Sequence, residues 1–520
     1  MAPEVTQDIE KLAAGATAAS LSDTPEAAPT SEKAPLSLLR ALDARIKSLS
    51  GFEARGITRV PPEERISPSS WDTISITLIW FSANMSVNSV AISLVGPLLL
   101  GLGFLDSAMC AFFGVSLGCV TTAYMATWGP RSGCRTVVVL RYFMGYWPAK
   151  LPAIFNIILM VGYCTINAII SGQMLSAVNG GGGGGGGGMP IAVGIVVVQI
   201  VCFVVTVFGM KLFQIYERFA WIPQILVLFV LVGSAAPYFD TAAQSVGDGP
   251  TLAANRLSYF CLCLSVSVSW CAAAADFFCY YPENTPRLSM FALSLAGLVS
   301  AFSLIFMIGI GLGTGVASHP AWAEAYAISA GALIVEGYGP LGAFGKFCGA
   351  VVALGLISNS IPSIYSASLG CQVLGRHGEK VPRYVWATVL IVIQLVLALA
   401  GREHLMAIIS NFVALMGYWS QFVVSIVIME HVLFRRAGAG GPGFDWARWQ
   451  DKQYLPIGYA AMVSFLMGWV GAVLGMYQVW YTGPLAVLAG NADVGTWVGT
   501  GFTIVSFLPL RWLELKLVGR

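Results

Sequence analysis

Long apolar stretches recur along most of this chain, and they limit its possible folds more than any other feature. Twelve of them, from Thr73 onward, reach the about 20 residues that a helix needs to cross a bilayer. Of the 520 residues, 57% are hydrophobic and 10% are charged, whereas soluble domains carry about 25% charged residues. The sequence therefore predicts an all-α integral membrane protein. Its spans are predicted over 73–100, 107–128, 151–176, 190–209, 219–236, 257–281, 289–315, 341–371, 384–400, 405–433, 456–477 and 492–511.

The basic residues are distributed unevenly among the segments that connect these spans. If the N-terminus lies inside, 25 of the 28 Lys and Arg residues fall on the cytoplasmic side, and only Arg256, Lys346 and Arg402 fall on the other. Cytoplasmic loops of membrane proteins are enriched in Lys and Arg. This asymmetry therefore predicts an even number of spans with both termini in the cytoplasm.

The segments outside the spans predict tails and a spacer. We place the membrane domain over residues 71–511, between a cytoplasmic tail over 1–70 and a second one over 512–520. The first tail is expected to be largely disordered, because its start is rich in Ala, Thr, Ser, Glu and Pro, with one short amphipathic helix over 36–49. The nine consecutive glycines Gly180–Gly188 are interpreted as a flexible spacer. No early apolar run indicates a cleavable signal peptide.

Composition and motifs also argue against several classes of function. A formal net charge of +2 argues against a nucleic-acid partner. Most of the eleven cysteines stand singly in apolar segments, and the four histidines lie in loops or near helix ends, so no metal site is expected. The chain has no HExxH motif and no Ser-His-Asp candidate. We therefore predict neither an enzyme nor a cofactor.

Polar side chains gather in four of the apolar spans. Amides present a donor and an acceptor side by side, and aromatic rings offer a flat face, so the set suits a planar, uncharged ligand. The alternative is that these groups only bond neighbouring helices, each bond contributing about 0.6 kcal/mol. The candidate binding residues are Ser82 and Asn84 in the first span, Tyr163 and Asn167 in the third, Trp270 in the sixth, and Asn359, Ser360 and Ser363 in the eighth.

Two carboxylates are candidates for coupling transport to an ion. Asp276 lies in the apolar sixth span, where a charge costs about 3 kcal/mol, so it is expected to face a cavity, a partner or a substrate path. The alternative for Asp276 is an interfacial helix cap. Glu217 opens the fifth span and is either a proton-coupling group or an acid favoured at a helix start. Separately, Gly309, Gly311, Gly313 and Gly315 in the seventh span have the small-residue spacing of packed membrane helices.

Ordered sequence strings point to a known family. They include GITRVPPEER before the first span, WFSAN within it, INAIISGQML, IYERFAWIP, YYPENTPR, NSIPSIYS, NFVALMGYW and the final LRWLELKLVGR. From about residue 55 to the end, the chain resembles the fungal purine-cytosine permeases of the nucleobase–cation symporter family. The resemblance implies a plasma-membrane transporter with two inverted five-helix repeats, spans 1–5 and 6–10, followed by two C-terminal helices. Spans 1 and 6 are expected to be interrupted and to frame the site.

The resemblance also implies roles for single residues. Ser82 and Asn84 match the polar positions of the first span, and Asn167 matches an asparagine that contacts substrate. Trp270 matches a stacking aromatic residue, and Glu217 matches an acid linked to coupling and function. The implied activity is import of adenine, guanine, hypoxanthine or cytosine with protons, with sodium as the less favoured ion.

The chain departs from the family at the expected site. The eighth-span pattern N-N-I-P-N reads here Asn359, Ser360, Ile361, Pro362, Ser363, and Tyr163 stands where tryptophan is usual. These changes leave the substrate open, and a vitamin B6 carrier is the alternative within the family. A membrane nutrient sensor that does not transport is the alternative from another class.

Overall fold

A computed structural model describes residues 57–65, 70–180, 188–208, 210–375, 378, 380–435 and 443–520, without the side chains of 70–73 and 207–221. Residues 50–520 form one compact unit. The predicted amphipathic helix over 36–49 and most of the glycine spacer lie outside the described residues.

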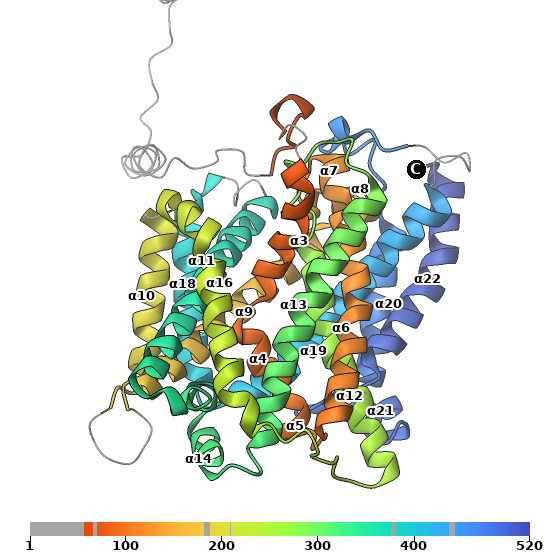
Figure 1. The fold of residues 1–520 in the computed structure, drawn as a ribbon. Helices are drawn as coiled ribbons and strands as arrows, with labels where there is room; N and C mark the ends of the chain where they lie inside the picture. The colour runs from red at the N-terminus through yellow and green to blue at the C-terminus, as the bar shows by residue number, and fades with distance from the viewer. Residues whose placement is uncertain are drawn as a thin grey trace, which may run out of the picture. The chain divides into compact units, whose positions relative to one another are not determined.

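The described part of the chain is mostly helical (Figure 1). Its elements, in chain order, are η1 (Pro62–Glu64), α3 (Ser70–Asn84), α4 (Val87–Ser93), α5 (Val95–Leu99), α6 (Phe104–Ala126), α7 (Trp128–Ser132), α8 (Thr136–Met144), α9 (Lys150–Val178), α10 (Ile191–Phe208), α11 (Met210–Ala235), η2 (Ala236–Tyr238), α12 (Gly249–Val268), η3 (Ser269–Ala272), α13 (Arg287–Gly315), α14 (Pro320–Ile328), α15 (Ala330–Glu336), η4 (Gly339–Leu341), α16 (Gly342–Val373), α18 (Arg383–Gly401), α19 (Leu405–Met429), η5 (Glu430–Phe434), η6 (Trp446–Arg448), α20 (Tyr459–Gly475), β1 (Tyr477–Gln478), β2 (Tyr481–Thr482), α21 (Pro484–Leu488) and α22 (Gly495–Val518).

Every predicted span overlaps at least one of these helices, in the expected order. Among the described residues, seven helices are long and apolar enough to cross a membrane, and the bent pair formed by α3 with α4 and α5 makes an eighth. Three further apolar helices, within α10, α11 and α20, are shorter. The all-α membrane fold is therefore confirmed, and the count of twelve spans stays a prediction.

The first span is broken near its middle, as expected. Its two halves, 74–84 and 87–99, meet at an angle of 60° (Figure 1). Ser86 is extended, with φ −127° and ψ 138°, so it cannot continue the helix. Just before the break, Asn84 Nδ2 donates to the Trp80 carbonyl at 2.8 Å. Such a local bond gives the backbone an alternative to regular helix.

The sixth span is also interrupted. Its helix α12 begins at Gly249 and ends at Val268, and the preceding Asp248 caps it by accepting from the Thr251 N–H at 3.0 Å. A single 3₁₀ turn, η3, follows, and 273–280 form turns. The Ala-rich sequence of these turns favours helix, so tertiary contacts outweigh the local propensity here.

Helix contacts repeat with an offset of five spans. The second span packs on the sixth (α6 on α12) and the first on the seventh (α3 on α13). The third span contacts the fourth (α9 with α10), and likewise the eighth contacts the ninth (α16 with α18). The third span also contacts the tenth (α9 with α19), and likewise the eighth contacts the fifth (α16 with α11). This exchange is the signature of two five-helix repeats. Because five is odd, the second repeat enters from the opposite face and is inverted.

Small residues bring the seventh span close to the broken first span. A Cβ added at Gly309 would lie 1.8 Å from Ser93 Oγ, and one at Gly313 would lie 2.4 Å from Pro97 Cγ. Only glycine permits this approach, so the packing role predicted for these glycines is confirmed.

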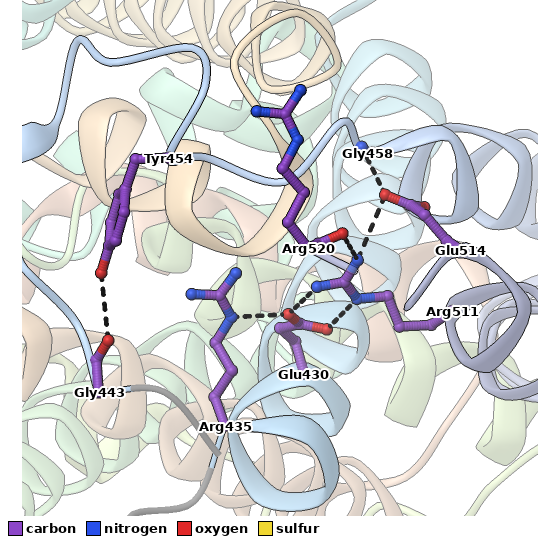
Figure 2. Close-up of polar contacts among 8 residues, drawn as sticks. All are labelled: Glu430, Arg435, Gly443, Tyr454, Gly458, Arg511, Glu514 and Arg520. Atoms are coloured by element: carbon purple, nitrogen blue, oxygen red, sulfur yellow. Dashed lines mark hydrogen bonds and ion pairs between the residues drawn. The ribbon is translucent and has the colours of Figure 1, made fainter. Parts of the chain in front are cut away.

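The two last helices are fastened to the end of α19 by buried charges (Figure 2). Glu430 accepts hydrogen bonds from Arg435 and Arg511, while Glu514 accepts from the Gly458 N–H at 2.9 Å. This Glu514 contact, together with one to the Ala460 N–H at 2.8 Å, satisfies free donors at the start of α20.

Candidate functional site

A cavity of about 330 Å³ lies where the two interrupted spans meet α16. Ser82 and Ser86 line it at the break of the first span, Trp270 and Asp276 at the interrupted sixth span, and Asn359 on α16. The two breaks therefore expose polar groups to a shared space inside an apolar protein. The cavity extends to Arg135, which directly precedes α8.

A smaller pocket of about 50 Å³ adjoins this cavity. It shares Ser86, Trp270, Asn359 and Ser363 with the larger cavity and continues along α4 and α9 toward Tyr163. Together the two spaces form one site between both repeats.

Three polar atoms that line the site lack a hydrogen-bond partner among the described residues. They are Ser86 Oγ, Asn88 Oδ1 and the Tyr163 hydroxyl, and all three are buried. Buried polar groups nearly always have a partner, protein or water. Because these atoms converge on one pocket, they are available to a polar ligand.

Aromatic side chains supply the apolar part of the site. Trp270 meets the buried Trp80 edge-on, with ring centroids 5.9 Å apart and planes at 84°. The Phe277 ring lies 6.0 Å from Trp270 and also lines the larger cavity. The contact with Trp80 fixes Trp270 while leaving it in the lining of both spaces, where it offers surface for stacking a planar ligand.

The eighth span contributes Asn359 and Ser363. Asn359 Nδ2 donates to the Ala83 carbonyl at 3.3 Å and so ties α16 to the last turn of α3. The Ser363 hydroxyl donates to the Asn359 carbonyl at 3.2 Å. Pro362 removes one backbone donor within α16, and the helix nevertheless continues without a break.

Two predicted binding residues bond each other outside both cavities. Asn167 Nδ2 donates to Ser360 Oγ at 3.2 Å, and both side chains are buried. Neither residue is among those that line the larger cavity or the smaller pocket. In this conformation the pair joins α9 to α16. The first-span pair does reach the site: Ser82 lines the cavity and Asn84 the pocket.

Asp276 combines the two roles that its sequence context allowed. Its Oδ1 accepts a hydrogen bond from the Thr136 N–H, the first of α8, at 2.6 Å, and Thr136 Oγ1 accepts from the Ala275 N–H at 3.0 Å. It therefore caps α8. Asp276 also lines the cavity, where Arg135 attracts it electrostatically, and it is the one carboxylate among the described lining residues.

Glu217 lies in α11, but its side chain falls outside the described residues. Its coupling role stays a prediction.

Sequence reasoning did not select several residues that line the site, among them Ser86, Asn88, Gln224 and Arg135. Ser86 and Asn88 belong to the polar string of the first span and carry a visible signal. Gln224, which follows a proline in α11, has only a weak signal. Arg135 has no signal in the sequence. It lies in the connection between the second and third spans, and nothing in the sequence indicates that this connection packs against the sixth span.

The sequence and the fold both match known transporters. Residues 59–499 match the family described as permease for cytosine/purines, uracil, thiamine and allantoin. The chain is 32% identical to the vitamin B6 transporter TPN1 of Saccharomyces cerevisiae, over 99% of this chain and 97% of that protein. It is also 32% identical to the purine-cytosine permease fcyB of Emericella nidulans, over 92% and 91%. An inward-facing structure of Mhp1 superimposes with a TM-score of 0.60 at 13% identity, over 89% of this chain and 96% of Mhp1, a likeness of fold.

Proposed function

We propose, from the premise that this chain belongs to the nucleobase–cation symporter family, that it imports a small planar heteroaromatic compound by alternating access. The chain is a multi-pass membrane transporter and not an enzyme. The observation that carries the substrate class is the site at the two interrupted spans, where Ser86, Asn88 and Tyr163 hold unpaired polar atoms near Trp270. A flat ligand would stack on the ring and bond these atoms.

A hydroxyl-bearing pyridine of the vitamin B6 class fits the lining better than a nucleobase does. Hydroxyl groups predominate over amides in the larger cavity, and the two amides there, Asn359 and Gln224, already donate to the Ala83 and Val351 carbonyls. Pyridoxine carries three hydroxyl groups, each able to donate and accept, whereas a base edge needs a free paired donor and acceptor. The lining hydroxyls are those of Ser82, Ser86, Ser358, Ser363, Tyr365 and Ser366.

A purine or cytosine is the second candidate and was the first choice from sequence. The relation to the fcyB permease supports it, at the same 32% identity as the relation to TPN1. The site also retains Asn84 and Asn359 from the pattern of the purine-cytosine permeases. The purine or cytosine takes second place because Ser363, and not an asparagine, lines both spaces of the site.

Proton coupling rests on Asp276, with Glu217 as the second candidate. Asp276 is a carboxylate in contact with the cavity, and protonation would weaken its attraction to Arg135 and its bond to Thr136. Such a change would alter the link between the interrupted sixth span and α8. Coupling to sodium is the alternative.

The cavity reaches α8, at the end of the bundle predicted to face the cytoplasm. We infer that this conformation is open to the inside, with both termini cytoplasmic and the protein in the plasma membrane.

Uptake of labelled pyridoxine, hypoxanthine and cytosine in a host that lacks such carriers tests the proposal. We expect saturable pyridoxine uptake that rises at acidic external pH and falls with a protonophore, with each base competing weakly. Strong base uptake without pyridoxine uptake would establish the second candidate. Absence of accumulation of all three, from protein shown to reach the surface, would leave the sensor alternative.

A further inference from the structure

Three cations converge on two aromatic rings in the connection between α8 and α9. Lys150 Nζ lies 4.4 Å from the ring centroid of Trp147, and Lys452 Nζ lies 4.9 Å from it. Arg141 Cζ lies 4.8 Å from the Tyr146 ring, to which Lys452 Nζ also approaches within 4.8 Å. Segments far apart in the sequence thus bring three positive charges to one place.

These charges have no carboxylate partner among the described residues. Arg141 is 4% exposed, and its guanidinium makes no hydrogen bond or ion pair within the described part of the chain. The nearby Asp451 is bound to Arg448 at 2.5 Å. Lys150 Nζ donates to the Leu374 carbonyl at 2.8 Å, which is a neutral acceptor. Arg141 is buried, and buried charges are normally paired, whereas Lys452 is exposed to solvent. The cluster therefore offers three positive charges to an anion.

The electrostatics of Arg141 agree with this account. Burial lowers the pKa of the Arg141 guanidinium, and the groups that oppose the shift are Tyr146, Cys134 and Tyr142, none of which is a carboxylate. A bound anion would offset this cost.

The cluster lies at the ends of three predicted membrane helices. Lys150 begins α9, Leu374 follows the last residue of α16, and Lys452 lies in the connection that leads to α20. Trp147 is 60% exposed and Tyr459, the first residue of α20, is 71% exposed. Exposed Trp and Tyr beside Lys are typical of the membrane interface. The distribution of Lys and Arg predicts that this interface is cytoplasmic, the side that carries anionic lipids.

We propose that Arg141, Lys150 and Lys452 bind the phosphate headgroup of an anionic phospholipid, with Trp147 at the boundary between headgroups and acyl chains. The bound lipid joins α8, the start of α9 and the connection that leads to α20. Lys150 in turn donates to the Leu374 carbonyl at the end of α16, the helix that carries Asn359 and Ser363. The lipid therefore stabilises the protein near the transport site. This role does not depend on which compound is carried.

The test compares the full chain in nanodiscs of phosphatidylcholine alone and of phosphatidylcholine mixed with phosphatidylserine. We expect a higher Tm in the mixed discs and retention of phosphatidylserine in native mass spectra. In the double variant Lys150→Gln/Lys452→Gln, retention should be about thirtyfold weaker, because each basic residue near an anionic surface contributes to lipid attraction. The shift in Tm should be lost with it.

Lys516→Gln is the matched control, because Lys516 Nζ lies 5.0 Å from the Trp512 ring without the other two cations. It should keep both the retention and the Tm shift. An equal Tm in both nanodiscs for the wild-type protein would overturn the proposal, as would a full shift in the double variant. If inorganic phosphate alone reproduced the shift in phosphatidylcholine discs, the site would bind free phosphate and the lipid assignment would be wrong.

Discussion

Arg511 donates two parallel hydrogen bonds to Glu430, from Nε to Oε2 and from Nη2 to Oε1, each 2.7 Å long. Glu430 is fully buried and also accepts from Arg435 Nε at 2.8 Å (Figure 2). The pair connects α22 to the turn η5 at the end of α19, which belongs to the second repeat. The C-terminal helices are therefore held to the repeats by charge as well as by apolar contact.

Glu430→Gln should destabilise the protein strongly. The substitution leaves two buried guanidinium groups short of one carboxylate, and breaking a buried pair typically costs about 3–5 kcal/mol. Thermal unfolding in detergent should show a lower Tm. Arg448→Met is the control, because its ion pair with Asp451 is exposed to solvent and contributes little to stability. A Glu430→Gln protein that melts like the wild type would show that the network does not support the fold.

Tyr163→Phe should weaken substrate binding without loss of stability. The hydroxyl is buried and unpaired, so its removal relieves an unsatisfied group, while a bond to the ligand worth about 1 kcal/mol is lost. The expected result is an about fivefold higher KM for uptake with an unchanged or higher Tm.

Tyr418→Phe is the control for Tyr163→Phe, and we expect the opposite effects on stability and on KM. The Tyr418 hydroxyl donates to Asp493 Oδ2 at 2.6 Å and accepts from Gln478 Nε2 at 2.9 Å, and Tyr418 lines neither space of the site. This variant should lose stability and keep its KM. If Tyr163→Phe kept the wild-type KM, the hydroxyl would have no part in binding.

Two substitutions of Asp276 distinguish its role as a helix cap from a role in coupling. In Asp276→Asn the side-chain oxygen still accepts from the Thr136 N–H but carries no charge, whereas Asp276→Ala loses both. We expect the Asn variant to keep the wild-type Tm and the Ala variant to lose about 1 kcal/mol of stability, as for a lost helix cap. If the carboxylate couples transport to protons, uptake by the Asn variant should no longer respond to external pH or a protonophore. If uptake by the Asn variant kept its full dependence on pH, Asp276 would act only as a helix cap.

The sequence was sufficient for the long apolar helices and for the helices that form the site, while the count of twelve spans stays a prediction. Apolar length located these helices, and the polar strings around Ser82 and Asn359 marked two walls of the site. The extent of the break in the sixth span could not be derived, because alanines there favour helix and the bond from Thr136 to Asp276 depends on α8, a segment distant in sequence.

The sequence also could not predict which way single side chains point, because this depends on how the helices pack. Asn167 and Asn88 are both amides in apolar spans. One pairs with Ser360 outside both cavities and the other has an unpaired oxygen at the pocket. Only the packing of α9 against α16 and α4 decides between these outcomes.

Ser363→Asn should shift selectivity toward nucleobases. Ser363 lines both the cavity and the pocket, and asparagine at this position restores the paired donor and acceptor of the pattern in the purine-cytosine permeases. A gained or lost hydrogen bond to substrate is worth about 1–3 kcal/mol, so we expect cytosine or hypoxanthine uptake to rise about tenfold while pyridoxine uptake falls. Competition between labelled pyridoxine and unlabelled bases measures the change directly. Ser363→Ala, which removes the hydroxyl without adding an amide, should lower pyridoxine uptake and gain no base uptake. If the Asn variant reached the surface and retained the wild-type preference, the serine in the eighth span would not set the substrate, and the case for a vitamin B6 cargo would lose its structural basis.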